Sequence, residues 1–231
     1  MGCCSFENSV DRQFGEKHAR RQLRRYQRRG VGGTAKMLLA GLVEARLTRG
    51  TVLDVGAGIG SLTFGLLEQG ADRAVIVEAS AASADAAASE ASRRGRAPAI
   101  RVVRGDFLDV ADQVPSADVV TLDRVVCCYP RYEQLLATAL DRAEHGFAFS
   151  YPRELWYMRT SLALANILMR TSSGFRTFVH PERAMRRLVE QAGFELVSHA
   201  QTLAWSADVF VRRTVAPCRP GFAAPGARPV V

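Results

Sequence analysis

The sequence lacks an apolar run of about 20 residues, the length that a helix needs to cross a lipid bilayer. Its longest apolar candidate, residues 161–169, is too short to span. The first residues lack the apolar core of a secretory signal, and Phe6 stands where the myristoylation pattern has Ser or Thr. We therefore expect a cytoplasmic protein without a transmembrane segment, and this reasoning leaves peripheral contact with a membrane open.

Cysteine is scarce, and its spacing is unlike that of a metal site. The five cysteines are Cys3, Cys4, Cys127, Cys128 and Cys218. Adjacent pairs differ from the Cys-x₂-Cys spacing of zinc sites, and an odd count argues against a disulfide framework. We expect reduced thiols and no bound metal, with a metal shared by the two pairs as the less favoured alternative.

Positive charge is concentrated near the beginning of the chain, whose net charge is +8. Seven basic residues lie between positions 17 and 29: Lys17, Arg20, Arg21, Arg24, Arg25, Arg28 and Arg29. On a helix most of them form one face. Such a face is consistent with solvation, with a lid over an anionic group, or with contact to nucleic acid or acidic lipid. We interpret residues 1–34 as a basic helical arm or lid.

The most specific pattern is a glycine loop at residues 56–60. An apolar run, residues 52–55, leads directly into it, and a helical pattern begins at Ser61. Glycines let the backbone turn sharply and leave no side chain between it and a ligand. A dinucleotide-binding loop that starts at Gly56 would place its third small residue at position 61, whereas the third glycine here is Gly60. The spacing therefore disfavours a nicotinamide oxidoreductase.

An acidic residue two positions before the loop completes the pattern acidic-x-Gly-x-Gly-x-Gly. This pattern resembles motif I of class I S-adenosylmethionine-dependent methyltransferases, and the likeness extends over roughly residues 35–213. It implies that the cofactor contacts the motif residues Asp54, Gly56, Ala57, Gly58 and Gly60. It also implies an α/β fold, in which a doubly wound, mostly parallel, seven-stranded Rossmann-like sheet has helices on both faces and ends in an antiparallel hairpin.

Three later strand patterns each end at a carboxylate: Glu78, Asp106 and Asp123. Ligands of doubly wound sheets bind at the carboxyl ends of the strands, so these side chains should meet at one edge. Glu78 follows Gly58 by 20 residues, a spacing from which a carboxylate can reach the ribose hydroxyls of a bound adenosine.

The resemblance assigns further cofactor contacts around these carboxylates. It implies that Asp106 accepts a hydrogen bond from the adenine amino group while Phe107 flanks the ring. Ala79, next to Glu78, joins the cofactor-binding set. Asp123 begins the loop that in the family faces the methionine part of the cofactor and the substrate.

Residues 152–180 form an insert at a place where the fold needs only a short connection. In this fold such inserts commonly cover the active site, and an aromatic start followed by an apolar helix suggests a flat or hydrophobic acceptor. The candidate substrate-binding residues are Tyr129, Tyr151, Trp156 and His180. The apolar positions Leu162, Leu164, Ile167 and Leu168 fit core packing equally well. No catalytic residue is assigned, because methyl transfer needs a general base only for a hydroxyl or a protonated amine.

The end of the sequence supports the same fold. Residues 181–192 favour a helix with Pro181 in its first turn and Gly193 at its stop, and two strand patterns follow. Residues 215–231 are rich in Pro, Gly and Ala, and we expect them to be disordered. The predicted division is the arm at 1–34, a methyltransferase domain at 35–214 that contains the capping insert, and the tail.

The sequence therefore predicts methyl transfer from S-adenosylmethionine to a small aromatic or hydrophobic molecule by in-line displacement. The arrangement of arm, core and insert resembles magnesium-protoporphyrin and ubiquinone-pathway O-methyltransferases. An RNA-modifying enzyme is the alternative, because of the basic arm. Enzymes that methylate base amino groups usually carry Asn/Asp-Pro-Pro-aromatic after the fourth strand, whereas here Asp123 is followed by no proline until Pro130. Nucleic acid is therefore disfavoured as a partner, and the oligomeric state is left open.

Overall fold

The computed structural model describes residues 4–213, apart from the side chains of residues 4–8, 168 and 170–172. One sheet with the strand order β3-β2-β1-β4-β5-β7-β6 forms its centre. The strands are β1 (Thr51–Val55), β2 (Arg73–Glu78), β3 (Ile100–Arg104), β4 (Ala117–Leu122), β5 (Ala143–Pro152), β6 (Phe194–Gln201) and β7 (Trp205–Arg212). Strands β1 to β5 are parallel, whereas β7 pairs antiparallel with both β5 and β6. This topology confirms the predicted seven-stranded sheet and its antiparallel hairpin.

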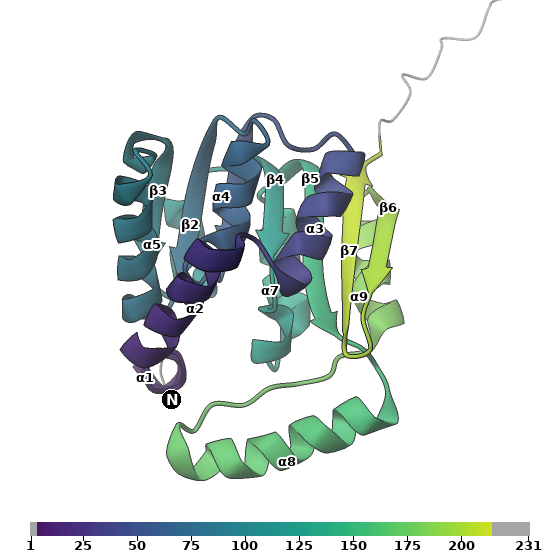
Figure 1. Ribbon diagram of the computed structural model, residues 1–231. Coiled ribbons are helices and arrows are strands. Elements are labelled where there is room, and N and C mark those ends of the chain that lie inside the picture. The colour runs from purple at the N-terminus through teal and green to yellow at the C-terminus, as the bar shows by residue number, and fades with distance from the viewer. Residues whose placement is uncertain (1–3, 214–231) are drawn as a thin grey trace, which may run out of the picture.

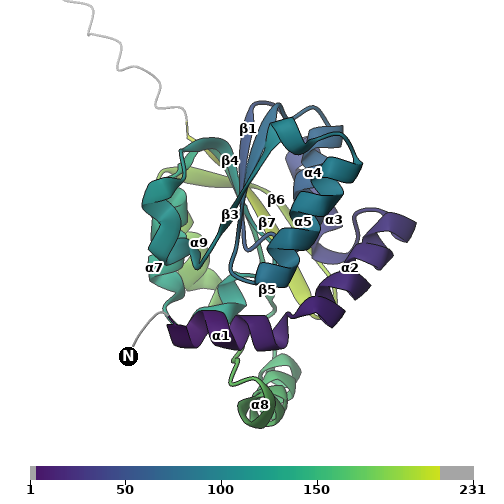
Figure 2. The same ribbon diagram turned by 90° about the vertical axis from the view of Figure 1, so that its left-hand side faces the viewer.

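Helices cover both faces of the sheet. The helices are α1 (Cys4–Gln13), α2 (Glu16–Arg29), α3 (Gly33–Glu44), α4 (Ser61–Glu68), α5 (Ala81–Arg93), α6 (Phe107–Val110), α7 (Tyr132–Leu140), α8 (Trp156–Ser172) and α9 (Glu182–Gln191). Short 3₁₀ turns are η1 (Ala97–Ala99), η2 (Ala111–Gln113) and η3 (Val126–Cys128). Figure 2 shows α3, α4 and α5 on one face and α7 and α9 on the other. None of the helices within 4–213 is long and apolar enough to cross a membrane.

Alternation along the strands divides the core into two layers. In β1 the side chain of Leu53 packs in the layer with α7 and α9, whereas Val52 packs in the layer with α3 and α4. Four large aromatics dominate the first layer: Phe147, Phe149, Phe194 and Phe210. Because both faces are covered, the sheet leaves its carboxyl edge as the place where polar side chains can gather.

Three helices lie toward this carboxyl edge, and one of them, α2, also packs on α4 and α5 through the buried ring of Tyr26. Figure 1 shows α8 below the sheet, with α1 and the start of α2 on the same side. The helical pattern expected at residues 17–29 corresponds to α2, and the apolar insert corresponds to α8. The sequence patterns did not lead us to assign α1, α3 or α7.

Candidate active site

The glycine loop after β1 forms a tight turn that requires its glycines. Gly56, Gly58 and Gly60 have φ angles of 62°, 57° and 79°, a region that side chains rarely allow. A Cβ on Gly56 would lie 2.5 Å from a methyl carbon of Val125. At Gly58 the nearest atom to such a Cβ is the side-chain oxygen of Gln22, at 3.5 Å. The loop therefore presents bare backbone toward the space beneath the arm.

Glu78 at the end of β2 is held against this loop. Its carboxylate accepts the N–H of Gly58 at 2.7 Å and the N–H of Ser80 at 2.8 Å. Burial raises the pKa of Glu78, and the backbone N–H groups of Ser80, Gly58 and Ala79 act in the opposite direction. The carboxylate is thus fixed at the position that the sequence spacing predicts, with the backbone of Ala79 close to it.

Asp54 lies behind the loop rather than on its surface. The side chain is fully buried, and its two oxygens accept the hydroxyls of Thr63 at 2.6 Å and Thr121 at 2.7 Å. Burial raises the pKa of Asp54 to about 6. These bonds tie β1 to α4 and β4, so the geometry favours support of the loop over direct contact with a ligand.

Asp106 follows β3 and caps α6. Its Oδ1 accepts the N–H of Leu108 at 3.1 Å and the hydroxyl of Tyr129 at 2.5 Å. Burial raises the pKa of both Asp106 and Tyr129. The Phe107 side chain is buried in the core layer beneath this carboxylate. The structure thus brings together Asp106 and Tyr129, which the sequence had assigned to the cofactor and to the substrate.

Asp123 begins the loop between β4 and α7. Its Oδ1 accepts the hydroxyl of Ser150 at 2.7 Å, and the same hydroxyl oxygen accepts the N–H of Arg124 at 2.8 Å. Arg124 has a φ of 62°, so the chain turns sharply at this point. Burial raises the pKa of Asp123. The guanidinium of Arg124 lies over the Trp205 ring at 4.8 Å, and its positive charge acts against the rise in the pKa of Asp123.

His180 is a buried side chain with a defined partner. Its Nε2 lies 2.9 Å from the carbonyl oxygen of Tyr129, and its ring centroid lies 4.4 Å from that of Tyr132. Burial lowers its pKa. The ring therefore joins the segment before α9 to the β4–α7 loop. Trp156, by contrast, has 79% of its surface exposed at the start of α8.

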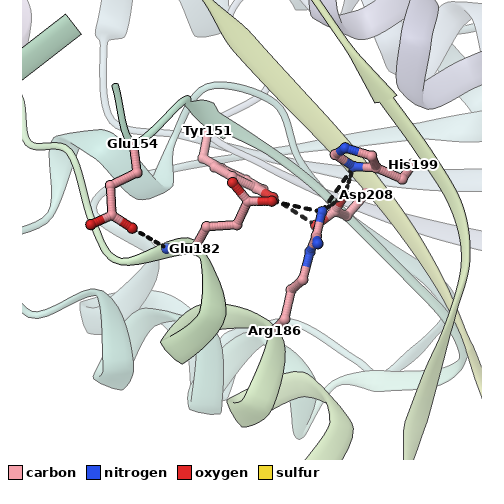
Figure 3. A network of polar contacts seen from close by, with 6 residues as sticks. All are labelled: Tyr151, Glu154, Glu182, Arg186, His199 and Asp208. Carbon is pink, nitrogen blue, oxygen red and sulfur yellow. Dashed lines mark hydrogen bonds and ion pairs between the residues drawn. The ribbon is translucent and has the colours of Figure 1, made fainter. Parts of the chain in front are cut away.

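Tyr151 belongs to a polar network centred on Asp208, shown in Figure 3. Its hydroxyl donates to the fully buried Asp208 at 2.9 Å. Arg186 donates to both oxygens of that carboxylate, at 2.8 and 3.0 Å, and His199 Nδ1 lies 2.6 Å from it. Burial raises the pKa of Tyr151. This hydroxyl therefore connects β5 to β7 and α9.

The arm lies against the carboxyl edge, through contacts that the sequence did not specify. Asp11 accepts the N–H of Ala81 at 2.9 Å, and the Ser80 hydroxyl donates to the carbonyl of Phe14 at 3.0 Å. On α2, the side chain of Gln22 lies 2.6 Å from His18 Nε2. The turn between α1 and α2 therefore packs directly on the connection that follows Glu78.

The arm also meets the insert. The rings of Phe14 and Phe175 form an edge-to-face pair at 5.1 Å, and the Ser173 hydroxyl donates to Gln13 Oε1 at 3.0 Å. Phe175 is buried by this contact. The arm and the insert thus join at the carboxyl edge. Aromatic residues at positions 14 and 175 are the only sequence signal that could have suggested it.

Metal-ligating side chains are grouped at one place in the described residues, the trio Asp118, Glu144 and His145. Two of the three are exposed, and Asp118 accepts hydrogen bonds from Thr51 at the start of β1. This trio is far from the strand ends that carry Glu78 and Asp106. The expectation that the protein binds no metal remains a prediction.

Fold and site together define the class of protein. A glycine loop follows β1, and carboxylates stand at the end of β2 and after β3, at the carboxyl edge where doubly wound sheets bind their ligands. The profile of a methyltransferase domain family matches residues 20–199. The chain belongs to this family, and it is an S-adenosylmethionine-dependent methyltransferase.

Solved structures share the fold at low sequence identity. Magnesium protoporphyrin IX methyltransferase from Synechocystis PCC 6803, crystallised with S-adenosylhomocysteine, has a TM-score of 0.67 at 20% identity, over 89% of this chain and 99% of that one. An O-methyltransferase family protein from Burkholderia thailandensis has a TM-score of 0.69 at 15% identity, over 92% and 64%. Mitomycin 7-O-methyltransferase has a TM-score of 0.59 at 19% identity, over 88% and 60%. No curated protein matches the sequence. At these identities the likeness establishes the fold.

Proposed function

We propose that this methyltransferase acts on a small aromatic or hydrophobic molecule by in-line displacement. S-adenosylmethionine supplies a methyl group on a positively charged sulfur. Glu78 and Asp106 would hold its adenosine part, and the loop that begins at Asp123 would face its methionine part. The bare glycine loop fits this ligand, because a side chain at Gly58 would point into the space between the loop and Gln22.

The observation that carries the cofactor assignment is unpaired negative charge. Four carboxylates lie at or just behind the strand ends: Asp54, Glu78, Asp106 and Asp123. Within residues 4–213 none of them forms an ion pair with Lys, Arg or His. Burial raises the pKa of each one, which means that the folded protein holds negative charge there at a cost. A cationic ligand relieves that cost, whereas the pyrophosphate of a dinucleotide increases it.

The acceptor class is supported by the side chains of the insert and of the β4–α7 loop. Met158, Leu162, Ala165 and Met169 are half-buried on one face of α8. The β4–α7 loop carries the buried ring of Tyr129, whose carbonyl oxygen lies 2.9 Å from the buried ring of His180. Apolar and aromatic walls select a flat or hydrophobic substrate, and positioning such a substrate in line with the methyl group can supply much of the rate.

Calorimetric titration with S-adenosylmethionine, S-adenosylhomocysteine and NAD tests the cofactor site. We expect micromolar binding of the first two and none of NAD. Binding of NAD alone would reject the proposal. If no ligand binds, the titration is repeated on a chain shortened by residues 1–29. Binding regained by that chain would mean that the arm closes the site, whereas continued absence of binding would reject the site assignment.

Transfer of a radiolabelled methyl group tests the acceptor. A panel of phenols, aromatic carboxylic acids and amines is compared with unmodified RNA. Methylation of RNA alone would favour the alternative function, which rests on the cationic side chains of α2. We prefer the small molecule because the loop after β4 lacks the proline-aromatic motif of base-methylating enzymes.

A further inference from the structure

Helix α8 is apolar on the side that faces away from the protein. With 3.6 residues per turn, the half-buried residues 158, 162, 165 and 169 share one face. The opposite face carries Trp156, Leu164 and Ile167, whose exposed fractions are 79%, 61% and 65%. A surface helix ordinarily places polar residues on its outer face. The outer face of α8 therefore exposes these three large apolar side chains, beside the smaller Thr160 and Ala163.

The hairpin beside α8 extends this apolar surface. Leu203, in the turn between β6 and β7, is 83% exposed. The hydroxyl of Tyr157 on α8 donates to the carbonyl of Leu203 at 2.5 Å, so the turn and the start of the helix are in contact. We call the exposed side chains of Trp156, Leu164, Ile167 and Leu203 the apolar patch. In the described part of the chain, seven large hydrophobic residues are exposed. Four of them form this patch, and a fifth, Tyr157, adjoins it.

A cationic surface lies on the neighbouring arm. All seven basic side chains of α2 line one shallow surface, which we call the basic face: Lys17, Arg20, Arg21, Arg24, Arg25, Arg28 and Arg29. Among the described residues, Glu16 forms the one ion pair with this set, at 2.9 Å from Arg20. The basic face therefore keeps a large positive charge that no other element of the described chain neutralises.

The two surfaces can be reached from one side. In Figure 2, α8 is the lowest element, and α2 rises from the end of α1, above α8, toward the right-hand outline. No other labelled element lies beyond either helix on that side, and Figure 1 shows α8 and the start of α2 both below the sheet. Helices α8 and α2, which carry the apolar patch and the basic face, therefore both lie on the outline of this side of the molecule.

We propose that this side of the protein docks on an anionic lipid membrane. Exposed apolar side chains insert at the boundary between headgroups and acyl chains, and arginines on an adjoining face bind the anionic headgroups. Trp156 is the residue type that is enriched at this boundary. Because α8 also covers the carboxyl edge of the sheet, docking brings the candidate acceptor site next to the lipid.

Two other occupants of this side of the protein, a second copy of the chain and RNA, are disfavoured. A second copy of this chain would bring a second basic face to the first, and like charges repel. RNA would satisfy the arginines, but the aliphatic side chains of Leu164, Ile167 and Leu203 give phosphates and bases nothing to bind. Only an anionic lipid surface uses both the apolar patch and the basic face.

Co-sedimentation of the full chain with phosphatidylcholine vesicles, with and without phosphatidylglycerol, tests the proposal. We expect binding to the anionic vesicles, weakening with added salt, and little binding to the neutral ones. Trp156 fluorescence should shift to shorter wavelength with the anionic vesicles, and Trp156→Phe should abolish the shift.

Two pairs of variants separate the apolar and cationic contributions. Leu164→Ser with Ile167→Ser, and separately Arg24→Gln with Arg28→Gln, should each weaken vesicle binding by about 10-fold or more. Their matched controls are Val43→Ser with Val197→Ser, which are exposed but outside the patch, and Arg49→Gln with Arg73→Gln, at the opposite edge of the sheet. Both controls should bind as the wild type does. Affinity for S-adenosylmethionine, measured in every variant, verifies that the fold is intact.

Several outcomes would overturn the proposal. They are absence of wild-type binding to anionic vesicles, equal losses in variants and controls, and a concentration-dependent dimer that the Leu164→Ser and Ile167→Ser pair abolishes without any vesicle binding. Salt-sensitive RNA binding with no vesicle binding would overturn it as well. Vesicle binding does not depend on methyl transfer, so failure of the proposed function would leave this result unaffected.

Discussion

Two fully buried aspartates, Asp54 and Asp208, have partners of different charge. Asp54, in the parallel half of the sheet, has only the neutral hydroxyls of Thr63 and Thr121 as partners. Asp208, in the antiparallel half, has the guanidinium of Arg186 on both of its oxygens. In Asp54 the parallel half thus holds a buried carboxylate without an ion pair among the described residues, whereas in Asp208 the antiparallel half holds one that is neutralised internally. Because the two halves differ in this way, we call the parallel half, where the proposed cofactor site lies, the binding half. We call the antiparallel half the structural half.

The largest effect should come from the structural half. Asp208→Asn removes the anion that binds two nitrogens of the half-buried Arg186 guanidinium and leaves it only Glu182, at 2.9 Å, so we expect a loss of about 3 kcal/mol in the free energy of unfolding. Urea denaturation measures it. The matched control is Asp112→Asn, which breaks the exposed pair with Arg142 and should cost much less. Equal losses in the two variants would show that the Asp208 network does not stabilise the fold.

The binding half should respond through pH. The pKa of Asp54 rises from 3.8 unfolded to about 6 in the folded protein, so its contribution to stability is present below pH 4 and is lost as the pH rises through 6. Asp54→Asn removes this dependence. The stability of the wild type relative to the variant should therefore fall by about 3 kcal/mol between pH 4 and 7. If the free energies of unfolding of the two proteins changed in parallel with pH, Asp54 would not be the source of the pH dependence.

Removing a ligand-facing carboxylate should weaken binding more than stability. Glu78→Ala and Asp106→Ala should each reduce the affinity for S-adenosylmethionine by about 10- to 100-fold, because hydrogen bonds to charged acceptors contribute about 1.5–3 kcal/mol. Titration calorimetry measures the change, and Asp72→Ala at the opposite edge serves as the control. Wild-type affinity in both variants would reject the assignment of these residues to the cofactor.

The smallest effect should come from the hydroxyl that orients Asp106. Tyr129→Phe removes one hydrogen bond at 2.5 Å and keeps the ring. We expect the affinity for S-adenosylmethionine to fall by about 3- to 10-fold, in line with about 0.5–1.5 kcal/mol for a single hydrogen bond. Tyr132→Phe, on the adjacent helix turn, is the control. A loss as large as that of Asp106→Ala would mean that Tyr129 itself contacts the ligand.

The sequence was sufficient to predict the sheet and the position of Glu78. Apolar runs, glycines and terminal carboxylates are local signals, and parallel topology places all strand ends at one edge. The Asp208 network was not predictable, because it depends on the antiparallel register that sets Asp208 opposite His199. The hydrogen bond from the Tyr151 hydroxyl to Asp208 depends on the same strand pairing, so no local pattern indicates it, and the assignment of Tyr151 to the substrate stays a prediction.

Local sequence patterns also did not predict the long-range contacts or the exposure of α8. The pairing of Phe14 with Phe175 joins residues 161 positions apart by one aromatic contact and leaves no periodic trace. For Leu164 and Ile167, an apolar helical repeat is the same whether the residues are buried in a core or exposed. The structure shows that these two are exposed, which corrects the interpretation as core packing.

The contact between arm and insert has a thermodynamic consequence. The arm packs on the connection after Glu78, the insert carries the proposed acceptor wall, and Phe14 and Phe175 join the two. A ligand that stabilises either segment in this position therefore also stabilises the other. By reciprocity, the factor by which the donor tightens binding of the acceptor must equal the factor by which the acceptor tightens binding of the donor.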